Sequence, residues 1–274
     1  MVKSGPADWT AGEVPVFGGR LAYHRTGGKG PPLILSHGLT DNGLCWTRLA
    51  RALEADFDII MLDARGHGAS SGVGPGDVVD PVRDLAEAVE ALGLTRVLVM
   101  GHSVGARASA GYAAAFPDRV RALVLEDPPL VPPMTPEARE RRLQAFREQV
   151  ARFRSMTEAE LRAFGMRQSP SWDPIEFPAW AASKRQVDAE ALPLLNSAWQ
   201  EDFRSLQSPT LLIHGESERG SMVAPEQARE ALELSPQPSG RPDSRSRAQC
   251  APRESCRRPP RRPQLPGRGL TSWT

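Results

Sequence analysis

The sequence predicts an α/β fold in which a mostly parallel central sheet is flanked by helices. Short, continuously apolar segments alternate with longer segments of helical periodicity, a pattern typical of parallel strands that are buried on both faces. One apolar segment, residues 97–100, leads directly into the pentapeptide GHSVG at 101–105, and a stretch of small residues follows it. Strand character returns at Thr210 after a long helical stretch, so the sheet is expected to continue there.

The remaining elements are predicted from the same two patterns. Strands are expected at residues 20–25, 32–36, 57–62, 97–100 and 122–125, and from residue 210 onward. Helices are expected where apolar residues recur at helical spacing, at residues 44–54, 81–92, 106–115 and 225–234. Between residues 132 and 206, helical patterns rich in arginine and glutamate contain three tryptophans, which indicates a helical insertion between two strands.

Length and composition place the chain among ordinary globular proteins. Its 274 residues suffice for one sizeable core, or for a core with a smaller insertion. No apolar run approaches the roughly 20 residues that a membrane span requires, and residues 1–6 lack the apolar stretch of a secretory signal. Three cysteines suggest no disulfide framework. These observations favour a cytoplasmic enzyme that does not bind membranes.

The pentapeptide centred on Ser103 carries the strongest functional signal. A G-x-S-x-G sequence has little weight alone, but between a buried strand and a helix it describes a nucleophile elbow, a sharp turn that exposes the serine hydroxyl. Gly101 and Gly105 fit this turn, because the strand and helix backbones come too close for side chains there. The start of the following helix supplies backbone N–H groups where negative charge would develop.

Three further motifs stand in register with the elbow. The dipeptide HG at 37–38 follows the strand at 32–36, DARGHG at 63–68 follows the next strand, and PTLLIHG covers 209–215. In this order the four motifs resemble the α/β-hydrolase fold family, over residues 14–236. The resemblance implies a hydrolase core at 1–129, a helical cap at 130–207 and a second part of the core at 208–236, whereas composition predicts a disordered basic tail at 237–274.

The resemblance also assigns roles to residues around Ser103. Ser103 would be the nucleophile that attacks a carbonyl carbon and forms an acyl-enzyme. The backbone N–H groups of Leu39 and Val104 would form the oxyanion hole that stabilises the negatively charged intermediate. These donors belong to the backbone, so the side chains at positions 39 and 104 carry little information about the role.

The acidic partner has four candidates. The family's usual acid stands three residues after Gly215, which points to Glu218. Some members instead take the acid from the end of the preceding strand, where Glu126 and Asp127 stand. Glu216 lies in the same loop as Glu218. The spacing favours Glu218 over Asp127.

The sequence contains no histidine where the resemblance places the general base. A serine hydroxyl is a weak nucleophile until an adjacent base removes its proton. The family takes that base from a loop after one last strand, whereas the five histidines here stand at positions 24, 37, 67, 102 and 214. For His37, His67 and His102 a structural or pocket-lining role is favoured, because the chain order in this fold is serine, acid, histidine.

Beyond residue 236 the composition changes abruptly. From Pro238 onward nine arginines stand against two acidic residues, proline and serine are frequent, and no strand pattern is present. Such a composition predicts a disordered segment. One interpretation is a basic tail that binds nucleic acid. The favoured interpretation is a one-base slip of the reading frame near Pro238, which removed the last strand, the catalytic histidine and the final helix.

The genetic code is compatible with such a slip. Synonymous codons can be chosen for residues 238–254 so that translation from the second base gives Leu-Arg-Val-Val-Gln-Ile-Pro-Gly-Ala-Gly-His. This product contains an apolar strand, a glycine turn and a histidine, in the order that the fold requires. The nucleotides across codons 248 and 249 decide the matter, since they must encode a histidine in the shifted frame.

The sequence therefore predicts a serine hydrolase of the α/β-hydrolase type that acts on a small-molecule ester, lactone or related carbonyl substrate. Its activity is expected to be impaired, because the catalytic histidine is missing. No metal-binding cluster or dinucleotide fingerprint is present, so no metal or cofactor is expected, and nucleic acid is not favoured as a partner. The alternative is a non-catalytic small-molecule binding protein that uses the pocket under the cap.

Overall fold

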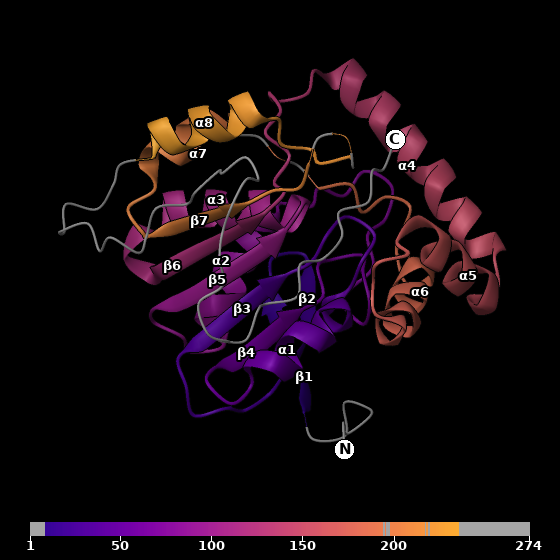
Figure 1. Ribbon diagram of the computed structural model, residues 1–274, viewed down its shortest axis with the longest axis horizontal. Helices are drawn as coiled ribbons and strands as arrows, with labels where there is room; N and C mark the ends of the chain where they lie inside the picture. Colours follow the sequence, from indigo (N-terminus) through magenta and orange to yellow (C-terminus); the bar gives the residue numbers. More distant parts are fainter. Residues whose placement is uncertain (1–8, 194, 196–197, 217, 219, 236–274) are drawn as a thin grey trace, which may run out of the picture.

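The computed structural model describes residues 9–235, except for 194, 196–197, 217 and 219. Its centre is a seven-stranded sheet with helices packed against it (Figure 1). The strands are β1 (Thr10–Val16), β2 (Gly19–Arg25), β3 (Pro32–Ser36), β4 (Asp58–Leu62), β5 (Val97–His102), β6 (Val120–Glu126) and β7 (Thr210–Ile213). The α-helices are α1 (Thr47–Leu53), α2 (Pro81–Ala91), α3 (Val104–Ala115), α4 (Pro136–Ser155), α5 (Glu158–Gln168), α6 (Phe177–Arg185), α7 (Trp199–Ser205) and α8 (Pro225–Leu234). Short 3-10 helices include η1 (Gly43–Trp46), which leads into α1.

The strands lie in the order β1-β2-β4-β3-β5-β6-β7. Strands β4, β3, β5, β6 and β7 pair in parallel, whereas β1 and β2 form an antiparallel edge next to β4. The predicted fold class, a mostly parallel sheet flanked by helices, is therefore confirmed. The sequence patterns do not predict β1, because Gly12 and Pro15 interrupt it and its pairing with β2 stabilises it.

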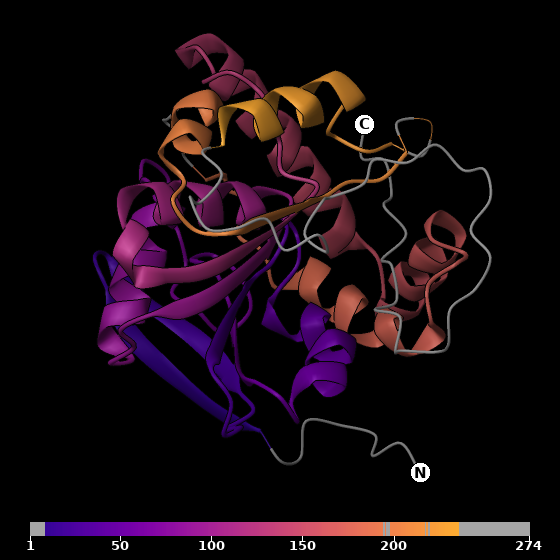
Figure 2. The same ribbon diagram turned by 60° about the vertical axis from the view of Figure 1, so that its left-hand side comes forward.

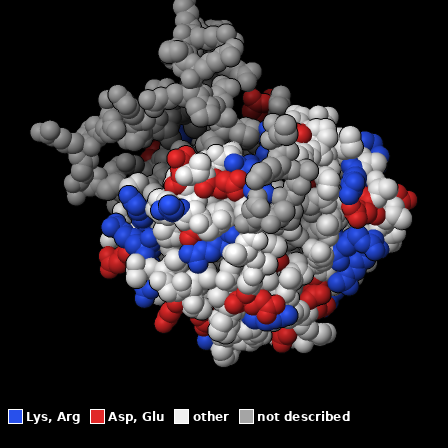
Figure 3. Space-filling view, turned by 90° about the horizontal axis from the view of Figure 1, so that it is seen from below, with Lys and Arg blue, Asp and Glu red and all other residues white. Residues whose placement is uncertain are grey.

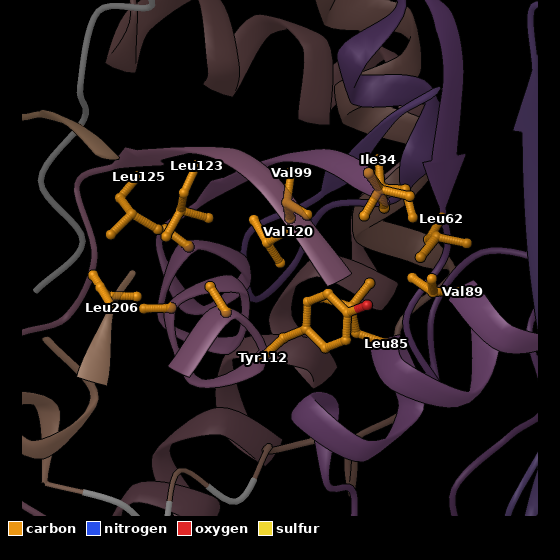
Figure 4. Packing of buried hydrophobic residues seen from close by; sticks show 14 of the residues in the cluster. Ile34, Leu62, Leu85, Val89, Val99, Tyr112, Val120, Leu123, Leu125 and Leu206 are labelled. Atoms are coloured by element: carbon orange, nitrogen blue, oxygen red, sulfur yellow. The ribbon is translucent and has the colours of Figure 1, made fainter. Parts of the chain in front are cut away.

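Apolar side chains pack on both faces of the sheet. Successive residues of a strand point to opposite faces, so Ile34 belongs to one cluster and Leu33 and Leu35 belong to another. The cluster around Ile34, shown in Figure 4, contains side chains of α2 and α3, whereas Leu35 packs with Trp46 and Ala50 of the η1–α1 segment. Burial of both faces explains why the strand sequences are continuously apolar.

Helices α4, α5 and α6 form a separate layer, and in the sequence they lie between β6 and β7 (Figures 1 and 2). This helical layer has a small core of its own that includes Phe153, Leu161 and Trp180. Helix α7 follows the layer in sequence but belongs to the main core, where Trp199 and Phe203 are buried with side chains of α3.

Helix α6 and the residues after it hold the helical layer against the sheet. The Lys184 ammonium lies 2.5 Å from a carboxylate oxygen of Asp41 and donates to the Thr40 carbonyl at 3.0 Å. Lys184 is only 1% exposed, so the ion pair is buried. Backbone hydrogen bonds between residues 66–68 and 186–188 continue the contact beyond α6.

On one face of the sheet, side chains become more exposed toward β7. Leu35, Met100, Val124 and Leu211 stand in one row across neighbouring strands. Leu35 is fully buried, Met100 and Val124 are partly exposed, and Leu211 is 44% exposed. Ile213, on the same face of β7, is 38% exposed. Within the described residues β7 pairs with β6 alone, so this part of the sheet has neither a further strand nor full cover on one face.

The surface of the described part carries both signs of charge. Basic and acidic side chains lie interspersed on the face that Figure 3 shows. No helix among the described residues is both long and apolar enough to cross a membrane. The tail predicted at residues 237–274 lies outside the described residues.

Replacing Lys184 by methionine is expected to destabilise the protein strongly. The substitution keeps a long side chain but leaves the Asp41 carboxylate, which is 13% exposed, without its cation. Removal of one partner from a buried ion pair costs about 3–5 kcal/mol of unfolding free energy. Urea unfolding measures the loss, with Lys29→Met at an exposed position as the control. A loss no larger than the ~1 kcal/mol typical of a surface pair would contradict this role.

Candidate active site

Ser103 stands at the turn between β5 and α3. Its φ of 52° and ψ of −123° lie outside the regions that residues with side chains normally adopt, so the turn holds the serine in a strained conformation. A Cβ atom on Gly101 would lie 2.4 Å from the Gly105 carbonyl oxygen, and one on Gly105 would lie 2.5 Å from that of His37. The two glycines are therefore required by the close approach of the backbones, as in a nucleophile elbow.

Ser103 lines a cavity of about 330 Å³ that the helical layer shares with the carboxyl ends of the strands. Leu39 and Val104, the two expected oxyanion-hole donors, also line this cavity. Val104 is the first residue of α3, so its N–H has no acceptor within the helix. Trp172 and Trp180 contribute from the helical layer. The cavity thus brings together the serine, both predicted donors and an aromatic wall.

Two buried histidines hold the loop that carries Leu39. The Nε2 atom of His37 accepts a hydrogen bond from the Ala64 N–H at 2.9 Å, so its Nδ1 carries the proton and donates to the Gly38 carbonyl at 2.8 Å. That carbonyl belongs to the same peptide group as the Leu39 N–H, so the bond orients this N–H. His67 Nε2 lies 2.7 Å from the Leu39 carbonyl oxygen. Burial and the neighbouring His67 lower the pKa of His37 to about 4, which keeps it neutral at pH 7.

Asp127 lines the same cavity and stands directly after β6. It is 4% exposed and has a positive φ of 47°. Its carboxylate accepts hydrogen bonds from the Ser221 hydroxyl at 2.7 Å and from the N–H groups of Met222 and Val223 at 3.0 and 3.3 Å. Adjacent parallel strands, β5 and β6, therefore bring Ser103 and Asp127 to one cavity.

The other acidic candidates lie elsewhere. Glu218 and Glu216 are exposed in the loop after β7, and neither lines the cavity. Glu126 is the last residue of β6 and is 6% exposed, and its Oε2 atom has no hydrogen-bond partner within the described residues. Of the four acidic candidates, the geometry brings Asp127 alone to the cavity of Ser103.

All five histidines belong to the described part of the chain, and none of them hydrogen-bonds the Ser103 hydroxyl there. His102 lines the cavity, but its Nδ1 is buried without a hydrogen bond and lies 3.9 Å from an Asp41 carboxylate oxygen. His24 lies in β2 and His214 follows β7. Across the described residues, His, Cys, Asp and Glu side chains form no group of three that could hold a metal ion.

A sequence profile described as "alpha/beta hydrolase fold" matches residues 31–166. The matched region contains the loop after β3, the turn at Ser103 and the position of Asp127. The chain belongs to the α/β-hydrolase fold family. The resemblance inferred from the four sequence motifs is thereby confirmed.

Curated relatives of this α/β-hydrolase bear hydrolase names. The chain is 29% identical over 216 residues to the 2-(acetamidomethylene)succinate hydrolase of Mesorhizobium japonicum, which covers 73% of this chain and 76% of the relative. It is 39% identical over 127 residues to the N-formylmaleamate deformylase of Pseudomonas putida, covering 44% of this chain and 46% of the relative. It is 40% identical over 109 residues to the lipase LipV of Mycobacterium tuberculosis, covering 39% and 41%. The last two matches therefore span less than half of each relative.

Solved structures share the fold of the α/β-hydrolase chain. The structure of an E-2-(acetamidomethylene)succinate hydrolase superposes with a TM-score of 0.63 at 24% identity, covering 86% of this chain and 88% of that one. An N-formylmaleamic acid deformylase from Pseudomonas putida S16 gives 0.60 at 24% identity, covering 84% and 90%. At these identities the likeness shows the common fold and nothing more specific.

No sequence pattern predicts three charged residues that line the cavity. Asp41, Arg142 and Lys184 all line it. They stand far apart in the chain and belong to none of the four motifs. Two weak signals exist: Asp41 closely follows the HG dipeptide at 37–38, and Lys184 is one of only three lysines in the chain.

A smaller cavity of about 60 Å³ adjoins the loop that carries Leu39. On its wall the Arg65 guanidinium donates to one oxygen of Asp84 at 2.8 Å. The other oxygen of Asp84 is buried and has no hydrogen-bond partner within the described residues. Burial therefore raises the pKa of Asp84 to about 6, although Arg65 opposes the shift.

Replacing Asp84 by asparagine is expected to change how stability depends on pH between about 4 and 6. In this window the folded protein keeps the Asp84 proton, with a pKa of about 6, whereas the unfolded chain has released it. Folding then takes up a proton, so the contribution of Asp84 to stability falls as pH rises. His37, with its pKa lowered to about 4, acts in the opposite direction because the unfolded chain binds a proton that the folded protein lacks.

The neutral amide removes the contribution of Asp84 and leaves that of His37. The Asp84→Asn variant should therefore gain stability with rising pH more steeply than the wild type, by up to about 1.4 kcal/mol per pH unit. Urea unfolding between pH 4 and 6.5 measures the slope, with Asp118→Asn at an exposed position as the control. Equal slopes in the wild type and the Asp84 variant would contradict the raised pKa.

Proposed function

We propose that this chain is a serine hydrolase that cleaves an ester, lactone or related carbonyl bond, with Ser103 as its nucleophile. The observation that carries the proposal is the meeting of Ser103, Leu39, Val104 and Asp127 at one cavity of about 330 Å³. The relatives, a lipase, a deformylase and a 2-(acetamidomethylene)succinate hydrolase, support hydrolysis in general rather than one leaving group.

In this mechanism the Ser103 oxygen attacks the carbonyl carbon of the substrate, and the hydroxyl proton passes to a general base. The N–H groups of Leu39 and Val104 donate to the oxyanion that forms. Collapse of this intermediate expels the leaving group, which takes the proton from the base. Water then attacks the acyl-enzyme in the same way, which releases the acid and regenerates the serine.

We assign Asp127, rather than Glu218, to the carboxylate that orients the base and stabilises its cationic form. Three points support this choice. Asp127 is buried, it lines the cavity with Ser103, and hydrogen bonds from residues 221–223 hold its carboxylate in place. Glu218 is exposed and away from the cavity wall.

The general base is the component that the described residues do not supply. We propose that a slip of the reading frame near Pro238 removed it, together with a last strand and helix. The exposed Leu211 and Ile213 on an edge strand support this idea, because a further strand and helix would cover them. Without the base, catalysis falls to what the oxyanion hole and substrate binding supply.

A second candidate is a non-catalytic binding protein that uses the same cavity. The observation in its favour is that no histidine of the described chain hydrogen-bonds the Ser103 hydroxyl. Fluorophosphonate labelling of the frame-restored protein separates the two functions, since an activated serine reacts with the probe quickly and an unactivated one does not.

Deleting the first base of codon 238 is expected to restore the activity. The frame-restored protein should hydrolyse p-nitrophenyl acetate on the order of 10⁴-fold faster or more, because it regains the base. Its fluorophosphonate labelling should accelerate in parallel and should vanish in Ser103→Ala but not in the control Ser155→Ala, an exposed helix-end serine. The idea of a slip fails if codons 248 and 249 do not encode a histidine in the shifted frame, or if the restored protein is no more active.

Two carboxylate variants of the frame-restored protein test the choice of acid. Asp127→Asn should lower kcat by about 10⁴-fold, because the amide leaves the base in the wrong tautomer. Glu218→Gln should stay within about tenfold of the parent protein, as a residue without contact to the base. The opposite pattern in steady-state kinetics would transfer the role to Glu218.

A further inference from the structure

Four charged side chains line the cavity of Ser103, two of each sign. Asp41 and Asp127 are acidic, and Arg142 and Lys184 are basic. What a ligand would experience depends on which of these charges already have a partner in the protein. Their hydrogen bonds and ion pairs differ sharply.

Lys184 is not available to a ligand. Its ammonium lies 2.5 Å from Asp41, donates to the Thr40 carbonyl at 3.0 Å and sits 4.6 Å from the centre of the Trp180 ring. With 1% of its surface exposed, it is enclosed by these groups. The pair of Lys184 and Asp41 contributes two opposite charges that compensate each other.

Asp127 is likewise occupied. Its carboxylate receives three hydrogen bonds from residues 221–223 on the sheet side of the cavity. It stands at the end of β6, whereas Arg142 belongs to helix α4 of the helical layer. Asp127 and Arg142, the two charges outside the pair of Lys184 and Asp41, therefore belong to different walls of the cavity.

Arg142 differs from three other arginines of α4. Arg139 donates to the carbonyl groups of residues 192 and 193, Arg147 pairs with Glu190, and Arg154 donates to the Val187 carbonyl. Within the described residues, no carboxylate or carbonyl accepts a hydrogen bond from Arg142. Within the described residues, the guanidinium that reaches the cavity is thus left without an acceptor.

Gln149 strengthens this arrangement. It stands seven residues after Arg142, two helical turns along the same side of α4, and it lines the same cavity. Its side-chain amide has no hydrogen-bond partner among the described residues. Helix α4 therefore presents a guanidinium and an amide to the space that Ser103 also lines.

We propose that this cavity takes a substrate that carries a carboxylate in addition to the carbonyl group attacked by Ser103, and that Arg142 binds that carboxylate. The proposal rests on the proposed hydrolase function of the same cavity. A guanidinium presents two parallel N–H donors that match the two oxygens of a carboxylate. Gln149 contributes an N–H donor from the next turns of the helix. Arg142 is then a specificity-determining residue, and neutral esters are poor ligands.

Calorimetric titration with succinamate and succinamide tests the proposal. The two molecules have nearly the same shape, but one carries a carboxylate where the other carries an amide. The titrations use the full chain with Ser103→Ala, so that no chemistry contributes to the heat. Succinamate is expected to bind at least about tenfold more tightly, as a charge-assisted pair predicts. Equal affinities, or no binding of succinamate, would overturn the proposal.

Two arginine variants in the same background locate the effect. Arg142→Gln should abolish the preference for succinamate, whereas Arg141→Gln should keep it, because Arg141 is exposed like Arg142 but does not line the cavity. Arg142→Lys retains the charge without the paired donors and should keep only part of the preference. A preference that survives in Arg142→Gln, or that falls equally in Arg141→Gln, would contradict a specific site. Circular dichroism establishes that each variant is folded.

These titrations can fail independently of the hydrolase proposal. If fluorophosphonate labelling of Ser103 fails in the frame-restored protein but the preference for succinamate holds, the cavity binds carboxylates without being catalytic, and the hydrolase proposal alone is lost. If Ser103 is labelled but succinamide binds equally well, the hydrolase acts on neutral substrates, and the role of Arg142 is lost.

Discussion

The turn at Ser103 depends on two backbones that approach each other too closely for side chains. Gly101 and Gly105 make this approach possible, and a Cβ atom at either position would lie within 2.5 Å of a neighbouring carbonyl oxygen. The Ser103 N–H donates to the Glu126 carbonyl of β6 at 2.8 Å, which anchors the strained residue to the sheet. Because α3 begins directly after the turn, its first N–H groups face the same space as the serine hydroxyl.

Parallel pairing explains why other residues converge on this turn. Strands β3 and β6 flank β5 in the same direction, so the loops that follow all three strands lie at one edge of the sheet. One loop carries Leu39, which His37 and His67 hold, and the other carries Asp127. Neither loop contributes through an exposed, mobile side chain, since hydrogen bonds from buried groups position both of them. The sheet therefore supplies a rigid floor for the cavity.

The helical layer supplies the other wall and decides the charge of the cavity. The buried pair of Lys184 and Asp41 adds little net attraction, because both ions lose their hydration on burial. Docked in this way, α4 lies with Arg142 at the cavity, while Arg139 and Arg147 of the same helix find acceptors at residues 190–193. The proposed chemistry of the serine and the proposed selection of a ligand thus come from different parts of the chain.

Local sequence patterns were sufficient for strands β2 to β7, for helices α1, α2, α3 and α8 and for the turn at Ser103, since these depend on periodicity and on glycine over a few residues, but they did not predict β1. Strand β3 and helix α8 have the predicted bounds. Spacing alone favoured Glu218 over Asp127, because the position of Asp127 depends on a positive φ and on donors about 95 residues away in the chain. The contact of Lys184 with Asp41 joins residues 143 positions apart. Such contacts form only when the helical layer docks on the sheet, because no short-range pattern records which side chains will meet across that interface.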